Sequence, residues 1–237
     1  MNILNAAAPA IPEKARIAEL TAKILIDIKA IHFCVDPPYI FTSGWASPVY
    51  TDMRKVIAFP RARRRLVDFA NTIIEQDIGC EAVDVVAGGE TAGIPYAAWL
   101  ADKMMLPMQY IRKKPKGFGR NAQIEGQIVA GARALLVEDL ATDGRSKANF
   151  VEALRNSGQA CDHALVFFFY DIFPQARADM DALGVKLHYL TTWRDVLAVA
   201  RANHSFPADT LNEVETFLNA PAAWSAAHGG IASFKAG

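Results

Sequence analysis

The feature of this sequence that most constrains its fold is the regular alternation, from residue 60 onward, of short apolar runs with longer amphipathic runs. The short runs predict strands at 83–87, 108–112, 134–137, 164–170 and 185–190, and the longer runs predict helices at 60–77, 91–103, 145–157 and 174–183. Strands that alternate with helices form a parallel sheet through right-handed crossovers, and such sheets bind ligands beyond the carboxyl ends of their strands. The sequence therefore predicts an α/β fold with a site at that edge.

The two ends of the chain are less regular. Residues 12–31 repeat apolar side chains at helical spacing, and residues 39–57 are aromatic and β-branched, which predicts a hairpin-like β unit. Two helical stretches follow residue 190. Residues after Pro221 are small and rich in Ala and Gly, so we expect them to be partly disordered. A length of 237 residues fits a single large domain.

Composition excludes several classes of function. The 25 Lys and Arg residues balance 25 Asp and Glu residues, so we expect no nucleic-acid partner. No apolar run approaches the roughly 20 residues that cross a bilayer, so we expect no membrane segment. Cys34, Cys80 and Cys161 are far apart, which predicts reduced thiols without structural zinc. The first residues do not have the pattern of a secretory signal, and we expect a cytoplasmic protein.

The most informative segment is an acidic one near the middle of the chain. The apolar run 134–137 is followed by Glu138 and Asp139, and then by the turn Thr142-Asp143-Gly144, which opens a helix. Backbone N–H groups at such a helix start bind phosphate, and the carboxylates accept hydrogen bonds from sugar hydroxyls or help to hold hydrated Mg²⁺. Taken alone, the segment is equally well read as surface charge before an ordinary helix.

Three further segments carry candidate chemistry. Residues 112–120 contain five cations, and Pro and Gly residues prevent a helix there; a solvated charge run is the ordinary alternative. The turn Gly88–Pro95 follows a predicted strand, and its N–H groups suit an anion. The stretch Phe41–Arg54 contains Ser43-Gly44, Ser47-Pro48 and several aromatic residues, of which Phe41 and Trp45 are expected in the core.

These four segments resemble motifs of the orotate phosphoribosyltransferases, members of the type I phosphoribosyltransferase family. The basic loop resembles a catalytic loop that reads Arg-Lys-Lys-Pro-Lys and ends in Ile-Glu-Gly, as residues 112–126 do here. The resemblance implies a central, mostly parallel β-sheet flanked by helices, with a small hood formed by the N-terminal segment. It further implies one domain over residues 1–237, with a hood at 1–58 that receives C-terminal contributions, a core at 59–205 and a C-terminal helix and tail at 206–237.

The implied reaction is the Mg²⁺-dependent transfer of a phosphoribosyl group from PRPP to orotate, with release of pyrophosphate, in pyrimidine synthesis. The residues that the resemblance assigns to catalysis are Lys116, Arg112, Lys113 and Asp139. Those assigned to PRPP are Glu138, Asp139, Thr142, Asp143, Gly144, Arg145, Ser146, Glu90, Thr91 and Ala92. Those assigned to orotate are Tyr50, Thr51, Thr42 and Thr142. Mg²⁺ is expected mainly on PRPP and water, with Asp139 as a candidate ligand. A homodimer is implied, in which the loop 112–126 acts on the neighbouring subunit.

The chain departs from the family pattern at several positions. Phe118 replaces a loop His, and Ile172 replaces an Arg that binds the orotate carboxylate in many members. Thr42 and Ala92 stand where some members have Lys. Two alternatives therefore stay open: a phosphoribosyltransferase for another nucleobase, favoured by Ile172, and a non-catalytic PRPP-binding regulator, disfavoured by Lys116 and the acidic pair.

Overall fold

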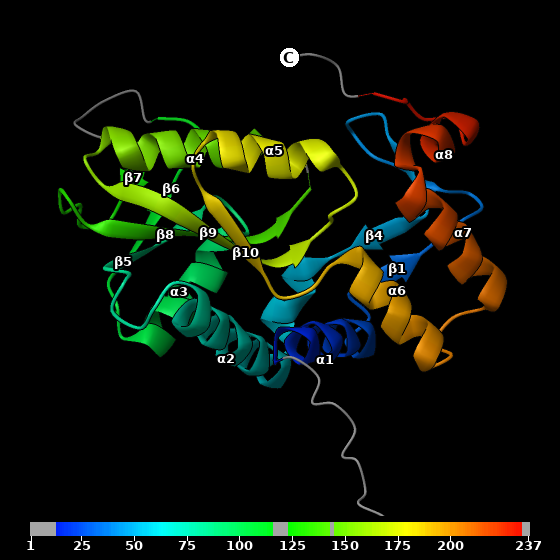
Figure 1. The fold of residues 1–237 in the computed structure, drawn as a ribbon, viewed down its shortest axis with the longest axis horizontal. Helices are drawn as coiled ribbons and strands as arrows, with labels where there is room; N and C mark the ends of the chain where they lie inside the picture. The colour runs from blue at the N-terminus through cyan, green and yellow to red at the C-terminus, as the bar shows by residue number, and fades with distance from the viewer. Residues whose placement is uncertain (1–12, 116–122, 143–144, 234–237) are drawn as a thin grey trace, which may run out of the picture.

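The structure is a computed structural model that describes residues 13–115, 123–142 and 145–233, with the side chains of Arg145 and Ser146 left undescribed. Among these residues, six strands form one sheet in the order β10-β9-β8-β5-β6-β7 (Figure 1). The neighbouring strands are parallel, except that β7 runs antiparallel to β6. The strands are β5 (Val85–Gly89), β6 (Met108–Ile111), β7 (Ile124–Glu125), β8 (Arg133–Ala141), β9 (Ala160–Phe169) and β10 (Lys186–Tyr189).

Helices cover both faces of this sheet. The helices α2 (Pro60–Asp77) and α3 (Gly93–Met104) lie on one face, and α4 (Arg145–Asn156) and α5 (Pro174–Ala182) lie on the other (Figure 1). Side chains of a strand alternate between faces, so Leu135 and Val137 of β8 pack with α2 and α3, whereas Leu136 packs with α4. The predicted α/β architecture with a mostly parallel sheet is confirmed.

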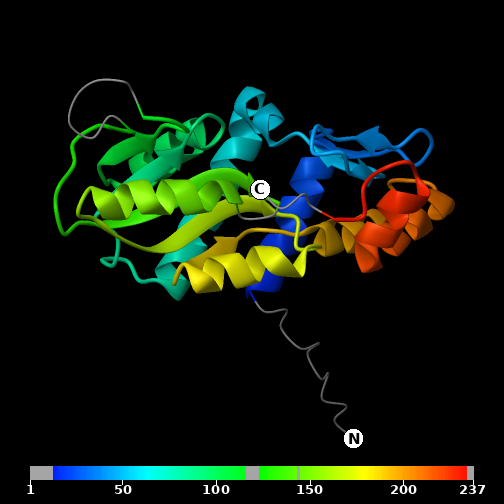
Figure 2. The same ribbon diagram turned by 90° about the horizontal axis from the view of Figure 1, so that it is seen from above.

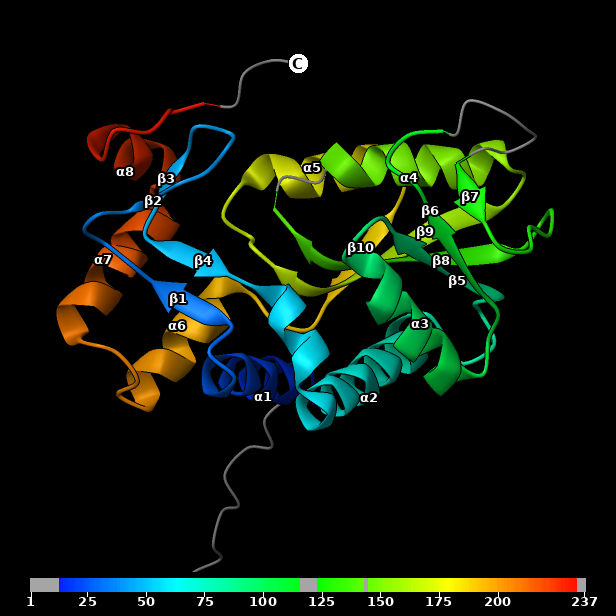
Figure 3. The same ribbon diagram turned by 180° about the vertical axis from the view of Figure 1, so that it is seen from behind.

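A second group of elements, which we call the hood, lies beside the sheet (Figures 2 and 3). It consists of β1 (Ile31–Phe33), β2 (Tyr39–Ile40), β3 (Ala46–Ser47), β4 (Val49–Thr51), the 3-10 helix η1 (Met53–Ala58), α7 (Ala208–Asn219) and α8 (Pro221–Ala227). The helices α1 (Glu13–Asp27) and α6 (Trp193–Ala202) pack side by side. One apolar cluster joins the hood, α1 and α6 to the α2–α3 face of the sheet, so the hood is fixed relative to the strands.

Two sequence-based boundaries were wrong near the N-terminus. The first helix ends at Asp27 instead of continuing to residue 31, because Lys29 has a left-handed φ of +55° and Ile31 begins β1. The hairpin-like unit predicted over residues 39–57 is limited to residues 39–47, where β2 pairs antiparallel with β3. Beyond it, β4 pairs with β1, and residues 53–58 form η1. The partner of β4 is β1, of which only the first residue, Ile31, falls within the segment that had been predicted as helix.

The chain after Pro221 is more ordered than expected. Residues 221–227 form α8, whose Ser225 is fully buried, and its Oγ accepts a hydrogen bond from Ala46 N at 3.0 Å. Ile231 N donates to Gly44 O at 3.0 Å, so the C-terminal segment is attached to β3 and the turn before it. Small residues are required there, since a Cβ on Gly230 would lie 2.3 Å from Ala46 N. Among the described helices, none has the length and apolar character needed to cross a membrane.

Candidate active site

A cleft with two chambers lies where the hood meets the carboxyl ends of β5 and β8. The first cavity has a volume of about 640 Å³, and we call it the apolar chamber because hood residues and aromatic rings line most of it. The second has a volume of about 630 Å³, and we call it the polar chamber because charged residues from strand ends line much of it. The chambers share a wall made of Arg54, Ala92, Asp139, Leu140 and Thr142. The site therefore lies at the edge where the sequence predicted it.

The acidic pair lies inside β8, not after it. The sequence predicted that this strand ends at residue 137, but pairing with β9 continues through Glu138 and Leu140 to Ala141. The prediction stopped too early because a carboxylate inside a buried strand is costly unless a partner neutralises it. Because strand side chains alternate, Glu138 and Asp139 point to opposite faces of the sheet. Glu138 reaches only the polar chamber, whereas Asp139 lines both chambers.

Glu138 has such a partner in Lys147 of α4. The Lys147 Nζ lies 2.5 Å from Glu138 Oε2 and donates to Leu140 O at 3.1 Å, and the two side chains are 2% and 11% exposed. This buried ion pair fixes α4 against the acidic strand. Lys147 had not been predicted as a functional residue. A signal was present, since Lys147 precedes Phe150, Val151 and Leu154 at helical spacing and therefore lies on the inward face of the helix.

Asp139 is the carboxylate that faces the cleft. Burial, and to a lesser extent the neighbouring charge of Glu138, raises its pKa to about 6 against the opposing effects of backbone N–H groups and Lys147. The side chain therefore gains a proton in weakly acidic solution. At neutral pH it is a negatively charged acceptor on the wall that the two chambers share.

Two glycines flank the turn between β5 and α3, and this turn lines the polar chamber. A Cβ on Gly93 would lie 2.5 Å from Val137 O, and a Cβ on Gly89 would lie 2.9 Å from Glu138 Cγ. Both positions therefore need a glycine to let the turn approach β8. The turn places Glu90, Thr91 and Ala92 in the lining of the polar chamber, so the structure brings these predicted PRPP residues close to the acidic pair.

The base of the basic loop is anchored beside this turn. Lys113 N donates to Glu90 Oε2 at 2.7 Å, and Asn149 Nδ2 of α4 donates to Lys113 O at 3.0 Å. Lys113 lines the polar chamber. Arg112 does not line either chamber, and its guanidinium lies 3.6 Å from the carboxylate of Glu125. The structure therefore places Lys113 in the polar chamber, whereas Arg112 lies outside both chambers.

Several predicted site residues cannot be placed. Lys116 and Phe118 of the loop lie outside the described residues, as do Asp143 and Gly144 of the phosphate turn. The backbone of Arg145 and Ser146 begins α4 next to Thr142, which lines both chambers. The described part of the turn therefore lies where the sequence predicted a phosphate site.

The predicted base residues line the apolar chamber. Tyr50 and Thr51 of β4 and Thr42 are all in its wall. The Tyr50 ring lies 5.5 Å from the ring of Tyr39 and 6.5 Å from that of Phe41. Phe41 is half-buried and faces the chamber, so it is not the core residue that was expected.

Other parts of the apolar chamber come from distant segments. Trp45 is 5% exposed, as predicted for a core residue, and packs edge-on against Phe173 at 5.0 Å. Ile172 lies in the same wall and is 7% exposed. Phe217 of α7 and Arg54 of η1 also line the chamber. Neither residue had been assigned a role: Arg54 ends the predicted stretch Phe41–Arg54, and Phe217 lies far from that stretch in the sequence.

Solved structures with this fold define the class of protein. No protein-family model matches the chain. UMP synthase of Leishmania donovani superposes with a TM-score of 0.72 at 24% identity, over 85% of this chain and 42% of that one. Orotate phosphoribosyltransferase of Aeropyrum pernix superposes with a TM-score of 0.66 at 29% identity, over 78% of this chain and 99% of that one. The fold is that of a type I phosphoribosyltransferase.

Sequence similarity then identifies the family. An orotate phosphoribosyltransferase of Sinorhizobium fredii is 56% identical over 227 residues, which cover 96% of this chain and 98% of that protein. One from Dinoroseobacter shibae is 55% identical over 217 residues, which cover 92% of this chain and 96% of that protein. The chain therefore belongs to the orotate phosphoribosyltransferase family. The predicted family, and with it the class of phosphoribosyl-transferring enzyme, is confirmed.

Proposed function

We propose that this chain transfers the phosphoribosyl group of PRPP to orotate and forms orotidine 5′-phosphate and pyrophosphate, a step of UMP synthesis. The observation that carries the proposal is the wall shared by the two chambers. Asp139 and Thr142 stand between a chamber walled by aromatic rings and a chamber lined by charged strand ends. A ribose at this wall would present its C1′ toward the aromatic side and its 5′-phosphate toward the start of α4.

Each group of PRPP has candidate partners in the cleft. Asp139 accepts hydrogen bonds from the ribose hydroxyls, and Glu138 is held beside it by Lys147. The 5′-phosphate binds at the start of α4, where Thr142, Asp143, Gly144, Arg145 and Ser146 offer backbone N–H groups. The turn with Glu90, Thr91 and Ala92 receives the pyrophosphate. Tyr50, Thr51 and Thr42 enclose the base.

The chain supplies positioning and charge more than covalent chemistry. The bond between C1′ and a pyrophosphate oxygen breaks, and a bond between C1′ and N1 of orotate forms on the opposite face of the ribose, while the N1 proton passes to water or to the departing pyrophosphate. Positive charge develops on the ribose ring, and negative charge develops on pyrophosphate. Lys113 lines the polar chamber of its own subunit and neutralises the departing anion there, and Arg112 and Lys116 are assigned the same task in the cleft of the neighbouring subunit. Lys116 is the leading catalytic candidate.

The cleft fits Mg²⁺ carried by the substrate. Within the described ranges, no three His, Cys, Asp or Glu side chains come together as a metal site. Glu138 is ion-paired, Asp52 faces Arg54, and Glu90 accepts from Lys113 N, which leaves Asp139 as the carboxylate suited to a cation. Mg²⁺ keeps several waters and binds through one or two carboxylates and phosphate oxygens. Asp139 would hold it with PRPP, and the ion would neutralise pyrophosphate charge.

We further propose a cytoplasmic homodimer in which the loop 112–126 acts on the neighbouring subunit. The three cysteines are free, which suits a reducing compartment. The loop leaves from the outer edge of the sheet, between β6 and the terminal strand β7. A loop at an edge can extend away from its own subunit, and a two-fold dimer would bring it to the partner's cleft.

The first test is an assay with purified protein, PRPP, Mg²⁺ and orotate, followed by the loss of orotate absorbance. We expect turnover that falls by orders of magnitude in Lys116→Ala. Absence of turnover with orotate would refute the proposed substrate. Turnover with uracil or a purine instead would identify a phosphoribosyltransferase for another base. Binding of PRPP without turnover on any base would identify a regulator.

The same variant tests the dimer. Lys116→Ala and Asp139→Asn are each expected to be nearly inactive, but their random mixture contains heterodimers. If the loop acts on the neighbouring subunit, each heterodimer has one intact site, and the mixture recovers about a quarter of wild-type activity. If the loop serves its own subunit, the mixture stays inactive.

A further inference from the structure

If orotate is the substrate, the apolar chamber must accommodate a negatively charged group. Orotate carries a carboxylate on its ring, and a carboxylate that enters an apolar cavity needs a charged or hydrogen-bonding partner. The charged residues in the chamber lining are Asp52, Asp139 and Arg54, so Arg54 is the only cation among the described lining residues. At the end of β9 the chamber wall is the buried side chain of Ile172, which cannot pair with an anion.

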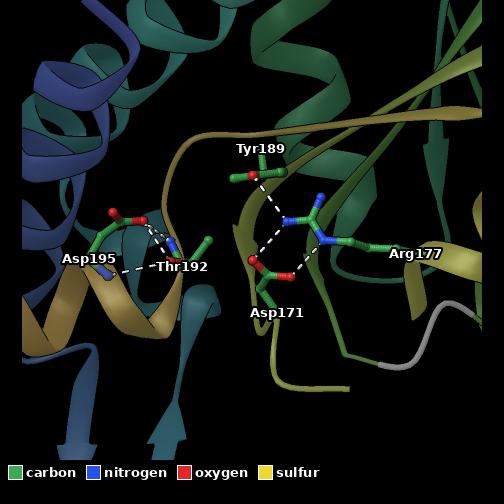
Figure 4. A network of polar contacts seen from close by, with 5 residues as sticks. All are labelled: Asp171, Arg177, Tyr189, Thr192 and Asp195. Atoms are coloured by element: carbon green, nitrogen blue, oxygen red, sulfur yellow. Dashed lines mark hydrogen bonds and ion pairs between the residues drawn. The ribbon is translucent and has the colours of Figure 1, made fainter. Parts of the chain in front are cut away.

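An arginine does lie near the end of β9, but it is already engaged (Figure 4). Arg177 of α5 makes two hydrogen bonds to the Asp171 carboxylate, at 2.8 and 2.7 Å, and a third to the Tyr189 hydroxyl at 3.2 Å. Its guanidinium also lies over the rings of Phe169 and Tyr189. Arg177 is absent from the lining of both chambers. It fixes the turn after β9 and leaves the chamber without a cation from that side.

Arg54, unlike Arg177, lines the chamber and uses only part of its hydrogen-bond donors. Its Nε donates to Asp52 Oδ1 at 3.1 Å, and its Nη2 donates to the Tyr50 hydroxyl at 3.1 Å. Both Nη1 hydrogens and the second Nη2 hydrogen have no partner among the described residues. The hydrogen bond to Asp52 and the charge of Asp52 raise the pKa of Arg54, so the guanidinium stays charged. Its free edge matches the two oxygens of a carboxylate.

We propose that Arg54 binds the carboxylate of orotate and makes the chamber specific for a pyrimidine carboxylate. Asp52 and Tyr50 act as positioning residues for its guanidinium. This inference rests on the proposed function, because it assumes that orotate occupies the apolar chamber. Arg54 also lines the polar chamber, so binding to the phosphates of PRPP is the competing outcome that the experiment must separate.

The experiment compares two nucleotides that differ only by the carboxylate, orotidine 5′-phosphate and UMP. Calorimetry would measure their dissociation constants for the wild type, Arg54→Met and Arg54→Lys. We expect the wild type to prefer orotidine 5′-phosphate, and Arg54→Met to lose about 10- to 100-fold of that affinity while binding UMP as before. Arg54→Lys, which keeps the charge but not the planar fork, should be intermediate. The Arg54 side chain is 65% exposed, so these variants are expected to fold.

Lys55→Met is the matched control. Lys55 is the next residue of η1, but its Nζ donates to Lys29 O at 2.7 Å and it lines neither chamber. This variant removes the same charge and should keep the nucleotide preference. In steady-state assays, Arg54→Met should raise the KM for orotate and leave the KM for PRPP unchanged.

Each remaining outcome has a distinct meaning. Equal loss of affinity for both nucleotides, or a rise only in the KM for PRPP, would place Arg54 on the phosphates and overturn the inference. An unchanged preference for orotidine 5′-phosphate in Arg54→Met would also overturn it. A wild type that neither prefers orotidine 5′-phosphate nor turns over orotate would instead refute the proposed function.

Discussion

The two chambers of the cleft are built on different principles. The polar chamber is made from short segments at the carboxyl edge of one sheet, where glycines let backbones approach and a buried ion pair fills the space between β8 and α4. The apolar chamber is made from large side chains that converge from β2, β4, η1, the turn after β9 and α7. The first depends on close backbone approach, and the second depends on how distant segments are held together. Substitutions should therefore act differently in the two chambers.

The largest expected effect is on activity in the polar chamber. Asp139→Asn removes the acceptor on the shared wall, and kcat/KM should fall by about 100- to 1,000-fold, as when a preorganised electrostatic contact is lost. Wild-type activity should itself fall as pH decreases through about 6, where Asp139 gains a proton. A rate profile over this range measures both effects. An acid limb that persists unchanged in the residual activity of Asp139→Asn would assign it to another group.

The same variant should be more stable at neutral pH. The folded-state pKa of about 6 lies above the ordinary aspartate pKa of 3.8, so the folded protein binds the proton more tightly than the unfolded chain. Stability from this group therefore decreases as pH rises from about 4 to 6, by about 3 kcal/mol. Asp139→Asn avoids that cost at pH 7. Urea unfolding of the wild type and of Asp139→Asn at pH 5 and pH 7 would measure this difference in stability. A variant less stable than the wild type at pH 7 would contradict the prediction.

The next effect tests close approach directly. Gly93→Ala places a Cβ 2.5 Å from Val137 O and 3.1 Å from Glu138 Cα, and both are backbone atoms of a central strand. We expect a loss of about 1–3 kcal/mol in the free energy of unfolding, together with a fall in kcat, because the turn and the acidic strand separate. Gly184→Ala is the comparison, since nothing lies within 4 Å of its Cβ and only its φ of +65° opposes the change. Equal losses in stability and equal kcat would show that close approach at Gly93 has no special role.

The difference between the chambers also explains what the sequence predicted. Glu138, Asp139, Glu90 and Lys113 were predicted because each lies in a contiguous motif in or just after a strand, and the structure places all four in the polar chamber. Arg54 stood in the predicted stretch Phe41–Arg54 but was given no role, because the sequence does not show that its guanidinium faces the chamber. Phe217 was missed because its place in the apolar chamber depends on packing between segments more than 150 residues apart. The helix α8 was missed for the same reason. Its small residues do not by themselves predict a helix. They fit closely against β3, where the contacts of Gly230 and Ser225 with Ala46 leave no room for larger side chains.

The smallest expected effect tests how the apolar chamber is held. Ser225 is fully buried, and its Oγ accepts from Ala46 N at 3.0 Å and donates to Ile231 O at 2.7 Å. Ser225→Ala leaves both backbone groups without this partner, which should cost about 1–2 kcal/mol. Ala46 and Phe217 line the apolar chamber, so the KM for orotate should rise a few-fold while the KM for PRPP stays constant.

Ser157→Ala is the control for this effect, because Ser157 donates to Leu154 O at 2.6 Å near the end of α4 and lines neither chamber. It should lower stability without changing either KM. If Ser225→Ala raised both KM values together, the chambers would be mechanically coupled through their shared wall. The contrast between a polar chamber fixed by backbone contact and an apolar chamber fixed by remote packing would then be wrong.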